Sequence, residues 1–439
     1  MKNPLNSLDS PSRRQFVERT AKAAFGLSVM PFTDQVMAQN ALPEGRKAKH
    51  IIYMFMSGGM THLDTFDPKP GTDNGGKTSG IPTGVAGIEV SEFLPGLAKH
   101  FKDIAVVRSM QQLTADHRGA AYWMRTSYSA RATIVHPCLG AWGQKLLGKS
   151  HDTLPSSVVV GGGGLHPGAG FLGPTYSPLP LGDPTGGLPN STYAPGVSED
   201  MFNTRMDMMN TFNSSFDRKF NNDEVKAYNE FYDNALKLMA SEELDVFDIN
   251  KETGEKRSQY GDNRFGQGLL LAKRLVSNGI RFVEVVNGGW DMHNDLWNNI
   301  PARAGEMDKA ITALIDDLKA EGLFEETLLV LTTEFGRSPR INANGGRDHH
   351  SACFSAMLAG GPIEGGQVYG ASDKEGHAPA EDTCPQVDFN ATIAKACGMP
   401  LDEVVFSPSG RPFLIAGHSR DVTTDDIIPR GKPIEQFFS

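Results

Sequence analysis

The stretch HIIYMFMSGG, residues 50–59, decides the expected fold, because an apolar run ends there in a serine and two glycines. Runs of this kind without polar alternation are typical of a strand that is buried on both faces of a sheet. Glycine allows the sharp backbone turn that a strand needs when it runs into a loop. We therefore expect residues 50–56 to form a central strand.

Other apolar segments have the length of strands, namely residues 104–108, 157–160, 280–286 and 327–332. Helical patterns lie between several of them. This alternation predicts an α/β fold with a mostly parallel central sheet and helices on both faces.

Long connections interrupt the pattern within a single expected α/β domain, residues 50–439. Residues 161–195 are rich in glycine and proline, which predicts a surface loop or lid. Residues 200–275 are polar with helical periodicity, including 223–240 and 264–276, and predict a helical insertion that either caps a site or covers the sheet.

An export signal is expected ahead of this domain. Residues 12–17, SRRQFV, match the twin-arginine signature, and a mildly apolar stretch follows over residues 21–32. Residues 36–38 suit cleavage, so residues 1–38 are interpreted as a twin-arginine signal peptide and 39–49 as a linker. The alternative is an amphipathic helix with an incidental arginine pair. The signal predicts the twin-arginine translocase as a partner and a periplasmic or extracellular location.

Composition excludes other classes of protein. The chain of 439 residues carries a net charge of -10, and a nucleic-acid partner is not expected because that partner needs a clustered basic surface. No apolar run approaches the roughly 20 residues that cross a bilayer, so no membrane span is expected. The four cysteines lack CxxC spacing, which leaves core thiols or one disulfide open.

Polar clusters follow two strands of the N-terminal half. His62 and Asp64 lie shortly after the first strand, where a surface turn is the alternative interpretation. Asp116, His117 and Arg118 open an apparent helix, whose N-terminus attracts anions, although Asp116 is also a suitable N-cap.

Two more clusters follow strands of the C-terminal half. Asp291 and His293 lie two apart in an extended loop and suit a divalent cation such as zinc or manganese. Glu334 and Arg337 follow the next strand. The alternative to a functional role for these two clusters is structural, with Asp–His or Glu–Arg pairs that tie loops together.

The last cluster, Arg347-Asp348-His349-His350, is bracketed by glycines. Because the carboxyl ends of parallel strands share one edge of a sheet, we expect all four clusters to meet there. The guanidinium groups of Arg118, Arg337 and Arg347 would receive an oxyanion, and the carboxylates and imidazoles would hold a metal that polarises it.

At these motifs the sequence resembles a bacterial exported family, domain of unknown function 1501. The resemblance extends over about residues 50–416 and rests on residues 58–70, 290–293, 333–339 and 346–349. The family is similar to a distant branch of the alkaline phosphatase and sulfatase superfamily, which implies a sandwiched parallel sheet and a metal-assisted hydrolase site.

The resemblance also implies roles for the residues of the metal site. Asp291, His293 and His349 match the Asp, His and late His that hold one metal, with a shortened Asp-to-His spacing. Glu334 stands where the superfamily has the Asp of an Asp-His pair, and Phe335 replaces the His.

Other positions depart further from the superfamily. Ser57 stands where the first strand usually ends in a metal-binding Asp, a loss for which His62 or Asp64 compensates. His117 replaces the usual nucleophile at the helix start. One metal is therefore expected.

The resulting hypothesis is an exported metal-dependent hydrolase of sulfate or phosphate esters, including esters of saccharides. The expected cofactor is a divalent metal ion: zinc, manganese or calcium. Arg337 and Arg347 would hold an anionic substrate. The attacking group would be water activated by the metal, or else the side chain of Thr61 or of His117. The alternatives are a non-catalytic periplasmic binding or assembly protein and a metal-dependent carbohydrate-modifying enzyme that acts on neither phosphate nor sulfate.

Overall fold

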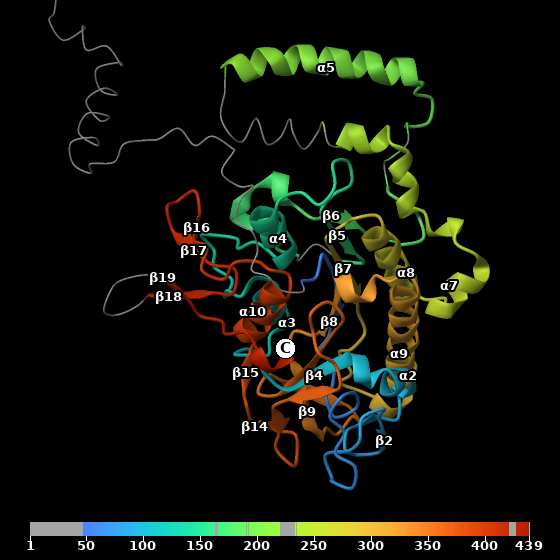
Figure 1. Ribbon diagram of the computed structural model, residues 1–439, viewed down its shortest axis with the longest axis vertical. Coiled ribbons are helices and arrows are strands. Elements are labelled where there is room, and N and C mark those ends of the chain that lie inside the picture. Colours follow the sequence, from blue (N-terminus) through green and yellow to red (C-terminus); the bar gives the residue numbers. More distant parts are fainter. Residues whose placement is uncertain are drawn as a thin grey trace, which may run out of the picture. The chain divides into compact units, whose positions relative to one another are not determined.

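Strand β1 (His50–Met56) lies in the middle of a mostly parallel sheet in a computed structural model of the chain (Figure 1). The structure describes residues 47–438 apart from 163–165, 190, 192, 220–232, 234 and 421–426. The expected signal peptide, most of the linker and much of the helix expected over 223–240 therefore lie outside the described residues.

The central sheet has nine strands within the described residues. Their order is β12 (Gln367–Tyr369), β4 (Ile104–Gln111), β11 (Phe354–Ala359), β8 (Thr327–Thr332), β1, β7 (Phe282–Asn287), β5 (Ser157–Val160) and β6 (Leu179–Leu181), with β15 (Cys384–Pro385) beside β4. Only β11 runs antiparallel to its neighbours, β4 and β8, among the described pairings of this sheet. The mostly parallel α/β fold predicted from the sequence is confirmed.

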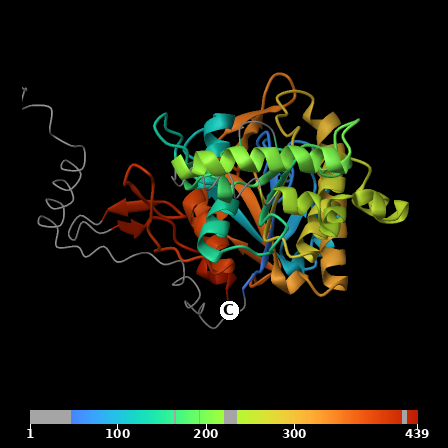
Figure 2. The same ribbon diagram turned by 90° about the horizontal axis from the view of Figure 1, so that it is seen from above.

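Helices cover both faces of this sheet because the strands are apolar on both faces (Figure 2). Ile52, Met54 and Met56 of β1 pack into one core, and the alternate residues Ile51 and Tyr53 pack into the other. The first core includes α2 (Pro95–Lys99), α8 (Arg264–Ser277) and α9 (Leu296–Ala320), and the second includes α3 (His117–Thr126), α4 (Leu139–Leu147) and α10 (Gln386–Ala396).

The first long connection contains a strand that we did not expect, whereas the described part of the second is helical, as predicted. The segment 161–195 supplies β6, which pairs with β5 and extends the sheet. The segment 200–275 contains α5 (Glu199–Lys219), α7 (Gly254–Tyr260) and α8, and the buried side chains of α8 belong to the core. None of the described helices is long and apolar enough to cross a membrane.

Small hairpins surround the sheet. They pair β2 (Gly80–Pro82) with β3 (Glu89–Ser91), β9 (Gly336–Ile341) with β10 (Arg347–His350), β13 (Ala371–Ser372) with β14 (Pro379–Glu381), β16 (Val405–Phe406) with β17 (Pro412–Phe413), and β18 (His418–Arg420) with β19 (Ile427–Pro429). The β9–β10 hairpin lies in a segment that we expected to be loop. All four cysteines are buried free thiols.

Candidate metal centre

The polar loops leave the sheet at one edge because three neighbouring strands end there. Strand β1 pairs in parallel with both β7 and β8, and Met56 at its end lies opposite Asn287 at the end of β7. Strand β4 has the same direction, since the antiparallel β11 separates it from β8. It leads into α3, so the loops that carry the four expected clusters leave the sheet at this edge.

Gly58 brings two of these loops into close contact. Its φ of +119° is rarely adopted by other residues, and a Cβ at this position would lie 2.4 Å from the backbone nitrogen of Asp291. Its N–H also donates to Oε1 of Glu334 at 2.8 Å. A single glycine thus joins the loops that follow β1, β7 and β8.

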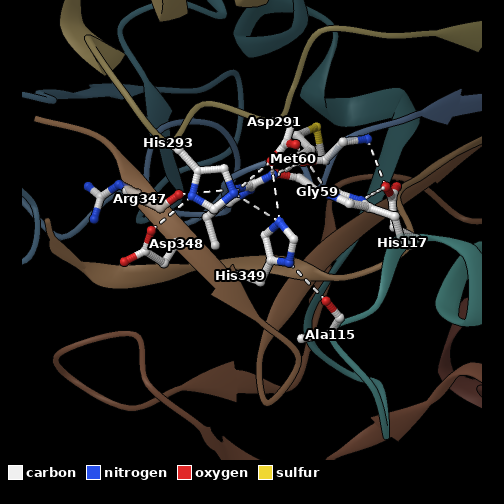
Figure 3. A network of polar contacts seen from close by, with 12 residues as sticks. Gly59, Met60, Ala115, His117, Asp291, His293, Arg347, Asp348 and His349 are labelled. Carbon is white, nitrogen blue, oxygen red and sulfur yellow. Dashed lines mark hydrogen bonds and ion pairs between the residues drawn. The ribbon is translucent and has the colours of Figure 1, made fainter. Parts of the chain in front are cut away.

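Asp291 lies at the centre of three imidazoles, as Figure 3 shows. Its Oδ1 is 3.1 Å from Nε2 of His293 and 3.3 Å from Nε2 of His349. Its Oδ2 is 3.4 Å from Nε2 of His117. The ligand atoms of His117, Asp291 and His349 all lie within 4.8 Å of one another, which is close enough to share one ion.

Each of these imidazoles is held by its outer nitrogen. Nδ1 of His349 donates to the carbonyl oxygen of Ala115 at 2.9 Å, and Nδ1 of His293 donates to Oδ1 of Asp348 at 2.8 Å. Nδ1 of His117 lies 2.7 Å from Oε1 of Glu334. Partners of this kind are typical of metal-binding histidines, because they fix the tautomer and turn the bare Nε2 toward the ion.

The inner nitrogens therefore face each other as acceptors. Nε2 of His293 is 3.0 Å from Nε2 of His349, and both outer nitrogens already carry their protons. Two lone pairs at this distance repel, and the guanidinium of Arg337, whose Nη1 lies 3.3 Å from Nε2 of His293, offsets only part of this repulsion. Nε2 of His117 is buried with no hydrogen-bond partner. As metal ligands, these ring nitrogens fit a bound divalent cation.

The kind of donor restricts the kind of cation. Imidazole nitrogens with one carboxylate suit zinc or manganese, whereas calcium takes oxygen ligands. Catalytic zinc sites commonly use three protein ligands and leave a position open. Calcium, which we included from the sequence, fits this donor set least well.

Arg337 is the counter-ion of the central carboxylate. Its side chain is 1% exposed, and its guanidinium donates to the carbonyl oxygens of Gly58 and Gly59 and to Asp291. Partial burial raises the pKa of Asp291, but the Arg337 hydrogen bond and charge outweigh it and lower this pKa overall. We expected Arg337 to hold a substrate anion, but the N–H groups of its guanidinium already donate to acceptors within the protein.

Glu334 lies behind His117 rather than facing the other donors. It is 1% exposed, and Thr333 donates to its second oxygen at 3.1 Å. The hydrogen bond to Glu334 raises the pKa of His117, more than partial burial lowers it. Glu334, which we expected among the metal ligands, thus orients a ligand, and His117, which we expected in the place of the nucleophile, offers a ligand atom.

A second expected group lies apart from this centre. The hydroxyl of Thr61 and Nε of Arg347 both donate to Oδ2 of Asp64, at 2.7 and 2.8 Å. All three side chains are buried. A buried guanidinium needs a counter-ion, and Asp64 supplies it. We expected Thr61 as the nucleophile, Asp64 as a metal ligand and Arg347 as the receptor for the anion. These roles are not supported, because all three side chains are buried and hydrogen-bonded to one another.

His62 is also remote from the imidazole cluster. Its Nε2 donates to the carbonyl oxygen of Gly376 at 2.9 Å, and burial lowers its pKa to about 4. The expectation that His62 compensates for Ser57 at a metal has no support from this position.

Sequence reasoning missed Asp348 and Ala115 as the partners that orient imidazoles. Asp348 directly precedes His349, and this adjacency in the quoted motif was the one signal for it. Ala115 contributes a backbone carbonyl, and because every residue has one, the sequence gives no sign of this role. The pairing of His349 with Arg337 across the β9–β10 hairpin also could not be seen, because the hairpin has a polar sequence.

The fold and the site together define an α/β protein with a candidate metal centre at the carboxyl edge of its sheet. The chain belongs to the family described as protein of unknown function, DUF1501, whose model matches residues 48–425. This confirms the family resemblance predicted from the motifs. A comparison with curated protein sequences finds no match.

A comparison with solved structures gives distant likenesses. The lipoteichoic acid synthase LtaP from Listeria monocytogenes has 10% sequence identity and a TM-score of 0.37, with 93% of each chain covered. The PsFucS1 sulfatase from Pseudoalteromonas sp. has 15% identity and a TM-score of 0.36, covering 89% of this chain and 72% of that one. An alkaline phosphatase from the Antarctic bacterium TAB5 has 10% identity and a TM-score of 0.35, covering 81% and 100%. Likenesses this distant say nothing about the chemistry of the site.

Proposed function

We propose that this chain is an exported, metal-dependent hydrolase of sulfate or phosphate esters, including esters of saccharides. The observation that carries the proposal is the cluster of His117, Asp291 and His349, whose ligand atoms lie within 4.8 Å of one another at the carboxyl edge of the sheet. The twin-arginine motif at residues 12–17 supports export to the periplasm or beyond.

His117, Asp291 and His349 would hold the cation, and His293 lies within reach of the same position. A divalent cation bound there polarises an ester oxygen and makes water a stronger nucleophile. The outer partners of the imidazoles direct each Nε2 toward the position of the cation, and Arg337 balances the charge of Asp291. The protein thus supplies a fixed set of donors before any ligand arrives.

The N-terminus of α3 is the group best placed to attract an anionic ester. His117 and Arg118 are its first residues, and Asp116 caps it by accepting from the N–H of Gly119 at 2.7 Å. Arg118 is exposed and has no ion pair among the described residues. Free N–H groups and a nearby guanidinium favour negative charge. Because Thr61 is buried, water remains as the attacking group.

A specific observation favours a second function, a non-catalytic binding protein. The two arginines that we expected to hold the substrate, Arg337 and Arg347, donate instead to protein oxygens. A protein that keeps the cation but has lost its anion receptors would bind a ligand without hydrolysing it.

Activity assays of the purified mature protein distinguish the two functions. The proposal predicts hydrolysis of 4-nitrophenyl sulfate, 4-nitrophenyl phosphate or a sulfated saccharide, loss of activity in chelator and recovery with zinc or manganese. In His349→Ala, kcat/KM should fall by at least about 100-fold, since metal-site residues commonly cost this much or more. The exposed His377→Ala is the matched control and should retain activity.

Two outcomes count against hydrolysis. Ester cleavage that survives both chelation and His349→Ala would remove the proposed mechanism. A protein that binds the cation and turns over none of these esters would support the non-catalytic alternative.

A further inference from the structure

We propose that a cavity beyond the C-terminal end of α3 binds a small, ring-bearing anion such as an acidic monosaccharide unit. The cavity measures about 320 Å³, which is at the small end of the range for ligand pockets. It is lined by residues that follow α3 and by residues of the chain's C-terminal segment, and we call it the α3 cavity.

Packed rings line the α3 cavity. Tyr128 stacks on His136 with ring centroids 4.6 Å apart and an interplanar angle of 11°. Phe413 meets both rings edge-on, at 5.3 and 5.2 Å. His136 and Phe413 are buried, so they form a rigid apolar floor against which a flat ring can pack.

Hydrogen bonds hold this floor in place without a ligand. The hydroxyl of Tyr128 donates to the carbonyl oxygen of Leu414 at 2.6 Å and accepts from its N–H at 3.0 Å. The hydroxyl of Tyr122 accepts from the N–H of His136 at 2.6 Å and lies 2.8 Å from its Nδ1. These two contacts to Tyr122 fix the orientation of the His136 ring.

In the part of the chain that the structure describes, the side chains of fixed charge that line the cavity are arginines. Arg131, Arg411 and Arg430 are exposed residues that line the cavity, and none forms an ion pair with a carboxylate of the described residues. Among the described residues, no aspartate or glutamate lines the cavity, although the chain has 52 acidic residues and only 42 lysines and arginines. Burial, followed by the charges of Arg131 and His418, lowers the pKa of His136 to about 4.

These features select one class of ligand. Guanidinium groups pair with carboxylate, sulfate or phosphate, and the aromatic floor adds contact with a ring. A cavity of this size is too small for a polyanion such as nucleic acid, which needs an extended basic surface. The ligand is thus a single ring with one anionic group.

The α3 cavity is distinct from the metal centre. Helix α3 begins at His117 in the metal centre and ends at Thr126, just before the lining residues Ser127 and Tyr128. A helix of ten residues spans about 15 Å. Binding in the cavity therefore does not require the metal centre to be catalytic.

Isothermal titration calorimetry of the mature protein tests the proposal with glucuronate and glucose 6-sulfate as probes. At least one should bind with a Kd below about 1 mM, and glucose should bind at least tenfold more weakly. Inorganic sulfate, which lacks the ring, should also bind more weakly. Added salt should weaken binding because the rim arginines are exposed.

Variants locate the binding. The double variant Arg131→Gln/Arg411→Gln should weaken binding by about tenfold or more. Arg205→Gln, an exposed arginine on α5, is the matched control and should bind like the wild type, as should His349→Ala of the metal centre. Circular dichroism checks that the double variant is folded, and Arg430→Gln provides an independent variant.

Several results would overturn the proposal. These are no binding of either acidic sugar below about 10 mM, equal binding of glucose or of sulfate alone, and unchanged binding in both arginine variants. Loss of binding in His349→Ala would place the ligand at the metal centre instead.

Discussion

Asp291 is in contact with three imidazoles and one guanidinium, so the charge balance at this one carboxylate decides what the centre binds. Without a cation, Arg337 neutralises it. A cation would require neutral imidazoles, whose one remaining proton the outer partners hold on Nδ1. Because the pKa of His117 is raised, the cation competes with a proton for Nε2 of this ring. The centre is therefore pre-organised by residues that never touch the ion.

Glu334→Gln tests this pre-organisation. The raised pKa of His117 arises first from its hydrogen bond to Glu334, so the amide should lower that pKa. A raised folded-state pKa stabilises the metal-free protein below the unfolded value of about 6.5, and this contribution is lost as pH rises through the folded-state pKa. Glu334→Gln should reduce that acid-side stabilisation.

Histidine-ring NMR of the metal-free protein measures the pKa of His117 directly. Asp348→Asn, which alters a partner of His293 and of Asn342 but not of His117, serves as the control and should leave the His117 titration in place. An unchanged or higher His117 pKa in Glu334→Gln would show that the carboxylate does not act on this ring.

Part of the site could be predicted at the level of residues. The Asp-x-His pattern at residues 291–293 and the Asp-His pair at 348–349 carry metal-binding residue types in loops after strands, and the structure brings them together. The pairing of Arg347 with Asp64, 283 positions away, could not be predicted. A single sequence does not show which charges become buried against each other.

The β9–β10 hairpin is the element that sets the position of His349. Its pairing places His349 opposite Arg337, and the turn packs against the loop of His293. A Cβ on Gly346 would lie 2.2 Å from the carbonyl carbon of His293. The absence of a side chain at this one residue lets the two imidazole-bearing segments approach.

Gly346→Ala should therefore separate His293 from His349. We expect a loss of about 1–3 kcal/mol in the free energy of unfolding, as for overpacked sites, and cation binding weakened at least about tenfold. Gly305→Ala is the matched control, because a Cβ there meets open space in the interior of α9. It should stabilise the protein by about 0.4–1 kcal/mol and leave cation binding unchanged.

Chemical denaturation and metal titration of both variants give the comparison. If Gly346→Ala binds the cation as tightly as Gly305→Ala, the hairpin does not position the site in the way described.

Elements with strong patterns were predictable and those with weak patterns were not. Strands β1, β5 and β8 have the bounds expected from their apolar runs, while β4 continues to Gln111. Strand β11 was missed because its short run contains small residues and follows a polar motif. The β9–β10 hairpin was missed because the sequences of both strands are polar and show no apolar alternation.

At the scale of the whole molecule, an α/β fold could be predicted because strands buried on both faces need helices on both faces. The order of the strands could not, since it depends on contacts between distant segments. The packing that covers the sheet and its loops also buries ionisable side chains. His62 and His136 both have their pKa lowered to about 4, with burial as the first cause.

These buried histidines predict acid sensitivity. Between the unfolded pKa of about 6.5 and the folded value, the unfolded chain binds protons that the folded chain does not, so the free energy of unfolding falls as pH falls. For His62 the loss between pH 7 and 4 is on the order of 2–3 kcal/mol. Its stabilising contribution is complete above the unfolded pKa.

His62→Gln keeps a donor for the carbonyl of Gly376 but does not titrate. Urea denaturation at pH 7 and pH 4.5 should show a shallower fall in stability for this variant than for the wild type. Equal slopes for both proteins would mean that His62 is not a source of the acid sensitivity.

Metal analysis of the purified mature protein tests the central claim, that His117, Asp291 and His349 hold one divalent cation. After loading with zinc or manganese and removal of excess, the wild type and the exposed control His377→Ala should each retain about one equivalent, and His117→Ala, Asp291→Ala and His349→Ala should each retain far less. A wild type that retains no cation, or a His349→Ala variant that retains as much as the wild type, would contradict the account.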